Sequence, residues 1–263
     1  MLTLKLKGFR RSFVLNNITR WLAVFFVFGL ISVIFGQELS YDKVFEGALE
    51  VGDEQLETNE YADTYSISLK KGQEVSFYMT SHQIKTYLFV VGPDGKQYDI
   101  GDYSEDDAAL GSSVELTLAI AKSGKYEITA TSLNEGEVGS YSVGVTIAKG
   151  VYNSFSKGSL AVGDKQFDDD SYYDVTEFNF KEGERVVIAV SSANSDDGGF
   201  DTYLIVKTPD GQSLENDDYP EGNSALSRVE FIALKTGTYV VKISSYDAEE
   251  TGDYILAVGH KKP

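Results

Sequence analysis

The chain of 263 residues repeats itself. A segment that begins Thr-Tyr-Leu and ends Pro-Asp-Gly occurs at 86–95 and again at 202–211. Other matches surround it in the same order: a Gly-x-Leu-x-Val-Gly-Asp segment opens each copy, and Gly-x-Tyr segments close it. Because an ordered set of matches indicates repeated structural units, we predict two copies of one domain, at 44–149 and 153–261.

Within each copy, apolar and polar residues alternate with a period of two, as at 65–69 and 141–145. That period is typical of strands with one buried face, and glycine-containing turns separate the runs. We therefore predict an all-β chain of two tandem antiparallel β-sandwich domains, jelly-roll-like, with seven or eight strands each. Four tyrosines occupy core-like positions on these strands: Tyr126, Tyr141, Tyr239 and Tyr254.

The N-terminal segment differs from the rest of the chain. Residues 1–36 hold five basic residues and no acidic ones, and 21–35 form a continuous apolar run. That run is shorter than the ~20 residues of a membrane-spanning helix, so it favours a secretory signal peptide cleaved after Gly36. The alternative is an uncleaved membrane anchor through 21–35. In both cases 37–43 forms a linker, and the domains lie outside the cytoplasm, secreted or on the cell surface.

Composition excludes several classes of function. The net charge is −18, which disfavours binding to nucleic acid and suits a cation or a basic partner. Cysteine is absent, so disulfides and thiol catalysis are excluded. The only histidines are His82 and His260, and no nucleophile-elbow, zinc-protease or phosphate-loop motif occurs. We therefore predict no catalytic residues and no enzymatic activity.

The ordered motifs resemble the bacterial pre-peptidase C-terminal domain. The second copy carries Gly-Asp at 163–164, Phe-Asp-Thr-Tyr-Leu at 200–204, Pro-Asp-Gly at 209–211 and Asn-Asp-Asp at 216–218. The first copy departs from the pattern at Lys85, which stands in place of the aspartate of Phe-Asp-Thr. The resemblance implies a non-catalytic β-sandwich that accompanies secreted bacterial enzymes. Some relatives resemble the collagen-binding domains of clostridial collagenases, which bind calcium.

Acidic residues of the second copy form the candidate metal site. Asp201 begins one expected strand, Asp217 and Asp218 follow the next, and a Pro-Asp-Gly hairpin between them would bring the three carboxylates together. Hard cations such as Ca²⁺ prefer such oxygen ligands. The alternative is that Asp201 caps a turn and the pair is solvated. Asp168, Asp169 and Asp170 form a second candidate, near Asp164 and Asp174.

The first copy changes this set of charges. Lys85 occupies the place of Asp201, and Gly101 occupies that of Asp217. We expect the ammonium of Lys85 to pair with Asp102 and to stand in for a cation.

Several tyrosines outside the core-like positions are candidates for a binding face, since aromatic rings contact polypeptides and glycans well. They are Tyr61, Tyr87, Tyr98, Tyr103, Tyr172, Tyr173 and Tyr219. The alternative is that most of them pack at the edges of the sandwiches. The sequence therefore predicts a binding or accessory module for an extracellular polypeptide or glycan, with Ca²⁺ as a candidate cofactor. The alternatives are a structural cell-envelope spacer without a specific ligand and a hydrolase that uses carboxylates alone.

The N-terminal prediction has a direct test. Because a short apolar run behind basic residues is a substrate for signal peptidase, we expect the exported protein to begin at Gln37. Intact-mass measurement of the exported chain checks this. A chain that still begins at Met1 and fractionates with membranes would support the anchor instead.

Overall fold

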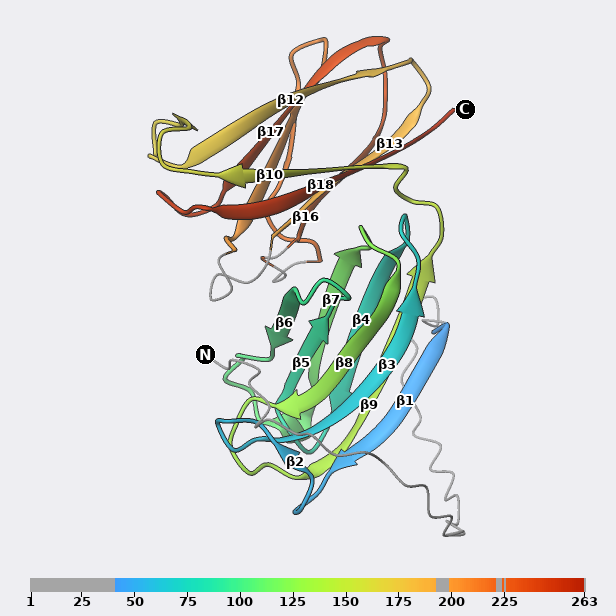
Figure 1. Cartoon of the computed structure of the whole chain (residues 1–263), viewed down its shortest axis with the longest axis vertical. Coiled ribbons are helices and arrows are strands. Elements are labelled where there is room, and N and C mark those ends of the chain that lie inside the picture. Colours follow the sequence, from blue (N-terminus) through green and yellow to red (C-terminus); the bar gives the residue numbers. More distant parts are fainter. Residues whose placement is uncertain (1–40, 193–198, 221–223, 225, 263) are drawn as a thin grey trace.

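The computed structural model describes residues 41–192, 199–220, 224 and 226–262. The predicted signal peptide or anchor, and most of the predicted linker, lie outside the described residues. The described chain forms two sandwiches, each made of a four-stranded and a five-stranded antiparallel sheet (Figure 1). The predicted all-β class and the tandem arrangement of sandwiches are thus confirmed.

The first domain uses strands β1 to β9. One sheet has the order β1 (Lys43–Leu49), β9 (Gly139–Ala148), β4 (Glu74–Ser81), β7 (Ser112–Ala119). The other has the order β2 (Glu54–Gln55), β3 (Tyr61–Leu69), β8 (Gly124–Ser132), β5 (Thr86–Val91), β6 (Gln97–Gly101). A single turn of 3₁₀ helix, η1 (Ala108–Leu110), precedes β7.

The second domain has the same topology, with each strand number raised by nine. One sheet has the order β10 (Ser154–Leu160), β18 (Gly252–Lys261), β13 (Arg185–Ser192), β16 (Leu226–Ile232). The other has the order β11 (Lys165–Gln166), β12 (Tyr172–Phe180), β17 (Gly237–Ser245), β14 (Thr202–Lys207), β15 (Ser213–Asn216). Each domain exceeds the predicted strand number, because β2 and β11 have two residues each and are too short to show alternation.

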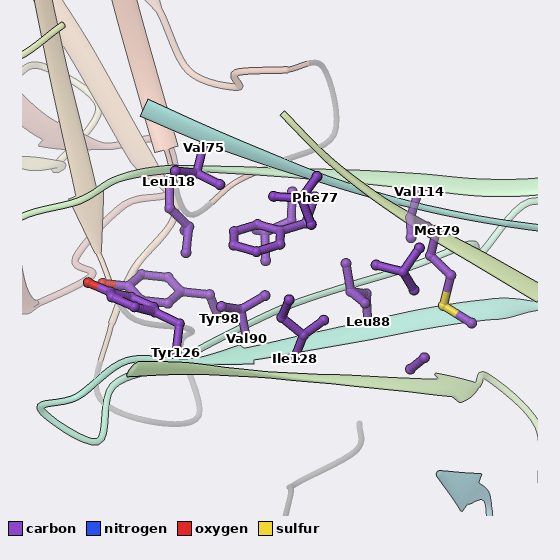
Figure 2. Close-up of a cluster of buried hydrophobic side chains, with 14 of the residues drawn as sticks. Val75, Phe77, Met79, Leu88, Val90, Tyr98, Val114, Leu118, Tyr126 and Ile128 are labelled. Atoms are coloured by element: carbon purple, nitrogen blue, oxygen red, sulfur yellow. The ribbon is translucent and has the colours of Figure 1, made fainter. Parts of the chain in front are cut away.

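Side chains from the two sheets of each domain meet in a core. Figure 2 shows Phe77 and Met79 of β4 facing Leu88 of β5 and Ile128 of β8, and all four are completely buried. The second domain has a matching cluster that includes Ile188, Leu204 and Tyr239. All four tyrosines expected in the core are at most 7% exposed. Burial of this apolar surface is the main force that holds each pair of sheets together.

A tyrosine that crosses a glycine joins the two sheets of each domain. Gly158 of β10 lies opposite Tyr254 of β18, and a Cβ on Gly158 would lie 2.1 Å from a carbon of the tyrosine ring. Across this gap the Tyr254 hydroxyl donates to Asp174 of the other sheet, at 2.7 Å. Gly47 and Tyr141 repeat the arrangement in the first domain. The glycine of each Gly-x-Leu motif is therefore required by close packing.

The two domains meet at a small junction. Tyr152, between the domains in sequence, is 3% exposed and packs with Ala119 of the first domain and Leu226 of the second. Oε2 of Glu74 accepts hydrogen bonds from the Tyr152 hydroxyl at 2.5 Å and from Nε of Arg228 at 2.7 Å. The Glu74–Arg228 pair is largely buried, so it fixes this contact more firmly than an exposed ion pair would.

A methyl group at Gly158 tests the tyrosine crossing. We expect Gly158→Ala to destabilise the second domain by about 1–3 kcal/mol, because the ring must move and Asp174 loses its donor. Chemical denaturation of the full chain measures this, with Ser159→Ala on the same strand as the control. Equal stability of the two variants would show that the close approach is not needed.

The proposed domain boundaries are tested by separating the copies. Each copy has its own two sheets and core, so we expect fragments 41–150 and 151–262 each to unfold cooperatively. We also expect both to melt below the intact chain, since the contact of Glu74 with Arg228 is lost. Circular dichroism during thermal unfolding checks both points. Failure of both fragments to fold would mean that the two copies depend on one shared core.

Candidate functional site

The Pro-Asp-Gly hairpin of the second domain brings its flanking acidic residues to one end of a sheet. Strands β14 and β15 pair so that Leu204 lies opposite Asn216. Asp201 directly precedes this pair of strands, and Asp217 and Asp218 directly follow it. The three carboxylates therefore lie at the same end of the hairpin, as the sequence predicts.

One side-chain oxygen of Asp201 lies buried at this end of the sheet. Its Oδ1 is buried, and no group among the described residues forms a hydrogen bond with it. Its backbone nitrogen donates to Oε2 of Glu250 at 3.2 Å. Burial, and then a set of neighbouring carboxylates, raise the pKa of Asp201 to about 7. These neighbours are Asp218, Glu250, Asp247 and Asp217.

Glu250 and Asp247 were missed by sequence reasoning. They lie between β17 and β18, far from the hairpin in sequence, and the pairing of β17 with β14 brings them to Asp201. The internal repeat held a signal for Glu250, because Glu137 occupies the matching place in the first domain. Oε2 of Glu137 accepts from the backbone nitrogen of Lys85 at 3.1 Å, as Oε2 of Glu250 does from that of Asp201.

In the first domain a lysine side chain takes the place of the unpaired acid. The Lys85 ammonium lies 3.3 Å from Oδ2 of Asp102 and donates to the carbonyl and hydroxyl oxygens of Ser104 at 3.0 and 2.8 Å. This confirms the expected ion pair. Burial opposes ionisation of Asp102, but hydrogen bonds from Ser112, Ser104 and Lys85 outweigh it and lower its pKa. The first domain thus supplies its own cation.

The second candidate group has other local contacts. Oδ1 of Asp169 accepts from the nitrogen and the hydroxyl of Ser171, and Asp170 lies in a turn with φ of 68°. Asp164 caps the turn before β11, and Asp174 accepts from Tyr254. Asp168 and Asp169 instead line a hollow. No set of three or more His, Cys, Asp and Glu side chains within the described ranges is arranged to hold a metal ion.

The hollow lies on the outer side of the β14–β15 hairpin and measures about 870 Å³. Its described lining includes three aromatic side chains, Phe167, Tyr203 and Tyr246, and the apolar Ile205. It also includes four carboxylates: Asp168, Asp169, Glu215 and Asp217. The hollow thus joins the second acidic candidate to part of the first.

The tyrosines expected to form a binding face have a different distribution. Tyr87, Tyr98 and Tyr172 are at most 8% exposed, so they pack within the sandwiches and do not form a binding face. Tyr103 is 66% exposed. Sequence reasoning missed Tyr203 and Tyr246, because alternation alone does not show which outward-facing ring borders a hollow.

The two histidines lie in different domains. His82 follows β4 in the first domain, and His260 lies on β18 in the second, 3.7 Å from Glu184. Within the described residues, no helix has the length and apolar character needed to cross a membrane.

Comparison with known proteins identifies the second domain. Residues 172–245 match the model of the bacterial pre-peptidase C-terminal domain. No curated protein matches the chain. A solved structure described as a "putative secreted protein" from Eubacterium rectale aligns over 84% of this chain and 74% of its own, at 11% identity. The TM-score of this alignment is 0.26. Residues 172–245 of the second domain are therefore similar to the bacterial pre-peptidase C-terminal domain, and the first domain repeats the topology of the second.

Proposed function

We propose that this protein is a non-catalytic extracellular binding module, in which the second domain responds to Ca²⁺ and engages an extracellular polypeptide or glycan. The family match supports an extracellular accessory role, because pre-peptidase C-terminal domains are accessory domains without catalysis of their own. The net charge of −18 supports a cation or a basic partner over nucleic acid.

One observation carries the calcium proposal: the same structural position holds a paired lysine in one domain and an unpaired acid in the other. Lys85 neutralises Asp102 in the first domain. Asp201 in the second has a buried oxygen with no described hydrogen-bond partner, and other carboxylates surround it. Uncompensated charge of this kind costs stability unless a proton or a cation is bound.

The chemistry of the donors fits Ca²⁺, which takes carboxylate and carbonyl oxygens in flexible geometry. Asp201, Asp217 and Asp218 would hold the ion, and Glu250 is a further donor, since it already contacts the backbone of Asp201. The described carboxylates do not form a ready cage. Binding therefore requires side-chain rotation, and we expect an affinity typical of extracellular modules, with Kd of about 10⁻⁴–10⁻³ M.

The pKa of Asp201 fixes the direction of the pH dependence. In the folded state it is about 7, well above the ordinary value of about 3.9 for aspartate. The stability that this group contributes is therefore fully present below its ordinary pKa and is lost as the pH rises through about 7. Ca²⁺ competes with the proton, so its affinity should increase over the same interval.

Asp201→Asn tests the site without changing its shape. Without Ca²⁺ at pH 8, we expect the variant to melt a few degrees above the parent chain, because the uncompensated charge is gone. At pH 5 the difference should be much smaller. At pH 8 with millimolar Ca²⁺, the parent should gain stability and the variant should not. Glu182→Gln, an exposed carboxylate on a turn of the same domain, is the control.

Calorimetric titration with Ca²⁺ completes the test. The Lys85→Met variant shows whether the first domain binds Ca²⁺ once its own cation is removed. Equal response of the parent and Asp201→Asn chains to Ca²⁺ would contradict the assignment of the site. Indifference of the parent to both Ca²⁺ and EDTA would refute calcium dependence. If ligand screens also fail, the alternative of a structural spacer in the cell envelope is favoured.

A further inference from the structure

The two domains differ most clearly at the hollow, and that difference points to what it binds. In the first domain the matching region is closed by a small apolar cluster that contains Leu56, Tyr87, Phe89 and Leu133. Phe89 is completely buried and Tyr87 is 3% exposed. The repeat places Phe167, Tyr203, Ile205 and Tyr246 at the corresponding positions of the second domain, where they line the hollow.

Backbone contacts confirm this correspondence. The nitrogen of Leu133 donates to the carbonyl of Lys85 at 2.8 Å, and that of Tyr246 donates to the carbonyl of Asp201 at 3.0 Å. Leu133 packs on the apolar cluster of its domain, whereas Tyr246 is 61% exposed. The backbone is therefore the same, and the side chains decide whether the space is filled.

A second tyrosine changes its role between the copies. In the first domain the ring of Tyr103 stands edge-on to that of Tyr87, with centroids 6.2 Å apart. In the second domain the matching residue is Tyr219, whose ring lies 4.8 Å from the guanidinium of Arg228 at the domain junction. Tyr219 thus contacts the domain junction. Tyr203, which matches Tyr87 of the first domain, borders the hollow.

The lining of the hollow has a clear charge. Its described residues include four carboxylates and no lysine or arginine. The Ser171 hydroxyl donates to Asp169 at 2.6 Å and the Tyr203 hydroxyl donates to Glu215 at 2.6 Å, so neighbouring hydroxyl groups hold both carboxylates in place. Lys242, beside the hollow, places its ammonium 4.7 Å from the ring of Phe167. An aromatic wall of the hollow thus already contacts an ammonium group within the chain.

We infer that the hollow of the second domain binds an extended polypeptide segment through its arginine or lysine side chains. This inference rests on the proposed function and specifies its ligand. An aliphatic stem matches Ile205 and the aromatic rings, and the cationic head matches the carboxylates. A guanidinium group both stacks on aromatic rings and bonds carboxylates in pairs. A neutral glycan would stack on the rings but bring no positive charge to the carboxylates.

Fluorescence anisotropy with a defined probe tests this inference. The probe is a labelled decapeptide with three arginines in a Gly-Ser background, and its citrulline analogue has the same shape without the charge. We expect the chain from residue 37 to bind the arginine peptide at 0.15 M salt, where exposed charges beyond ~8 Å are screened. The citrulline peptide should bind at least about tenfold more weakly.

Two variants locate the binding. Ile205→Phe with Tyr246→Leu gives two positions of the hollow the side chains of the first domain, so we expect binding to be lost. Asp168→Asn with Asp169→Asn removes two charges but keeps an oxygen acceptor for Ser171, so we expect binding about tenfold weaker. Glu54→Gln with Glu57→Gln is the matched control, because it removes two exposed charges around the equivalent turn of the first domain.

The outcomes separate this inference from the proposed calcium site. Loss of binding in both hollow variants, with unchanged binding in the control and unchanged thermal melts, supports the inference. Equal binding by all variants places the peptide elsewhere and overturns it. Binding of a glucosamine oligomer in preference to the peptide overturns the choice of a polypeptide. The calcium site is tested separately, by thermal melting of the parent and Asp201→Asn chains. Stabilisation by Ca²⁺ can therefore be observed when the peptide does not bind, and it can be absent when the peptide does bind.

Discussion

Each sandwich depends on the close approach of a tyrosine ring to the backbone of a glycine. Tyr141 and Tyr254 lie on the strands that pair with the first strand of each domain, and they cross Gly47 and Gly158 to reach carboxylates of the facing sheet. The ring provides apolar contact and its hydroxyl satisfies a partly buried acid, so one side chain holds both sheets at a fixed distance. Any side chain at the glycine would separate them.

On this common frame the two domains have different local chemistry. The first domain satisfies its sites from within: Lys85 compensates the acids at the end of its hairpin, and Phe89 fills the outer face of its sheet. The second domain has Asp201 and Ile205 at these places, and it leaves a buried oxygen without a hydrogen-bond partner among the described residues, and a hollow. Duplication therefore gives an internal comparison, in which one copy shows what the other lacks.

The junction links this difference to the arrangement of the domains. Arg228 binds Glu74 of the first domain and also lies over the ring of Tyr219. Tyr219 directly follows Asp218, so the same short segment contributes to the acidic group at Asp201 and to the domain junction. The acidic group and the contact between the domains therefore lie within a few residues of each other along the chain. This arrangement is absent from the first domain, where Tyr103 stays beside Tyr87.

The sequence by itself determined the all-β class, the duplication and the ends of the Pro-Asp-Gly hairpin, because alternation and turn residues act over a few neighbours. For the same reason it placed Asp201 beside Asp217 and Asp218, and it paired Lys85 with Asp102. Only the tertiary structure decided that Glu250 and Asp247 join Asp201, since β17 brings them from a distant part of the chain. It also decided that Tyr87 is buried while Tyr203 borders a hollow. Strand alternation gives both the same outward direction, and only the neighbouring side chains across the sheet determine whether the space above them is filled.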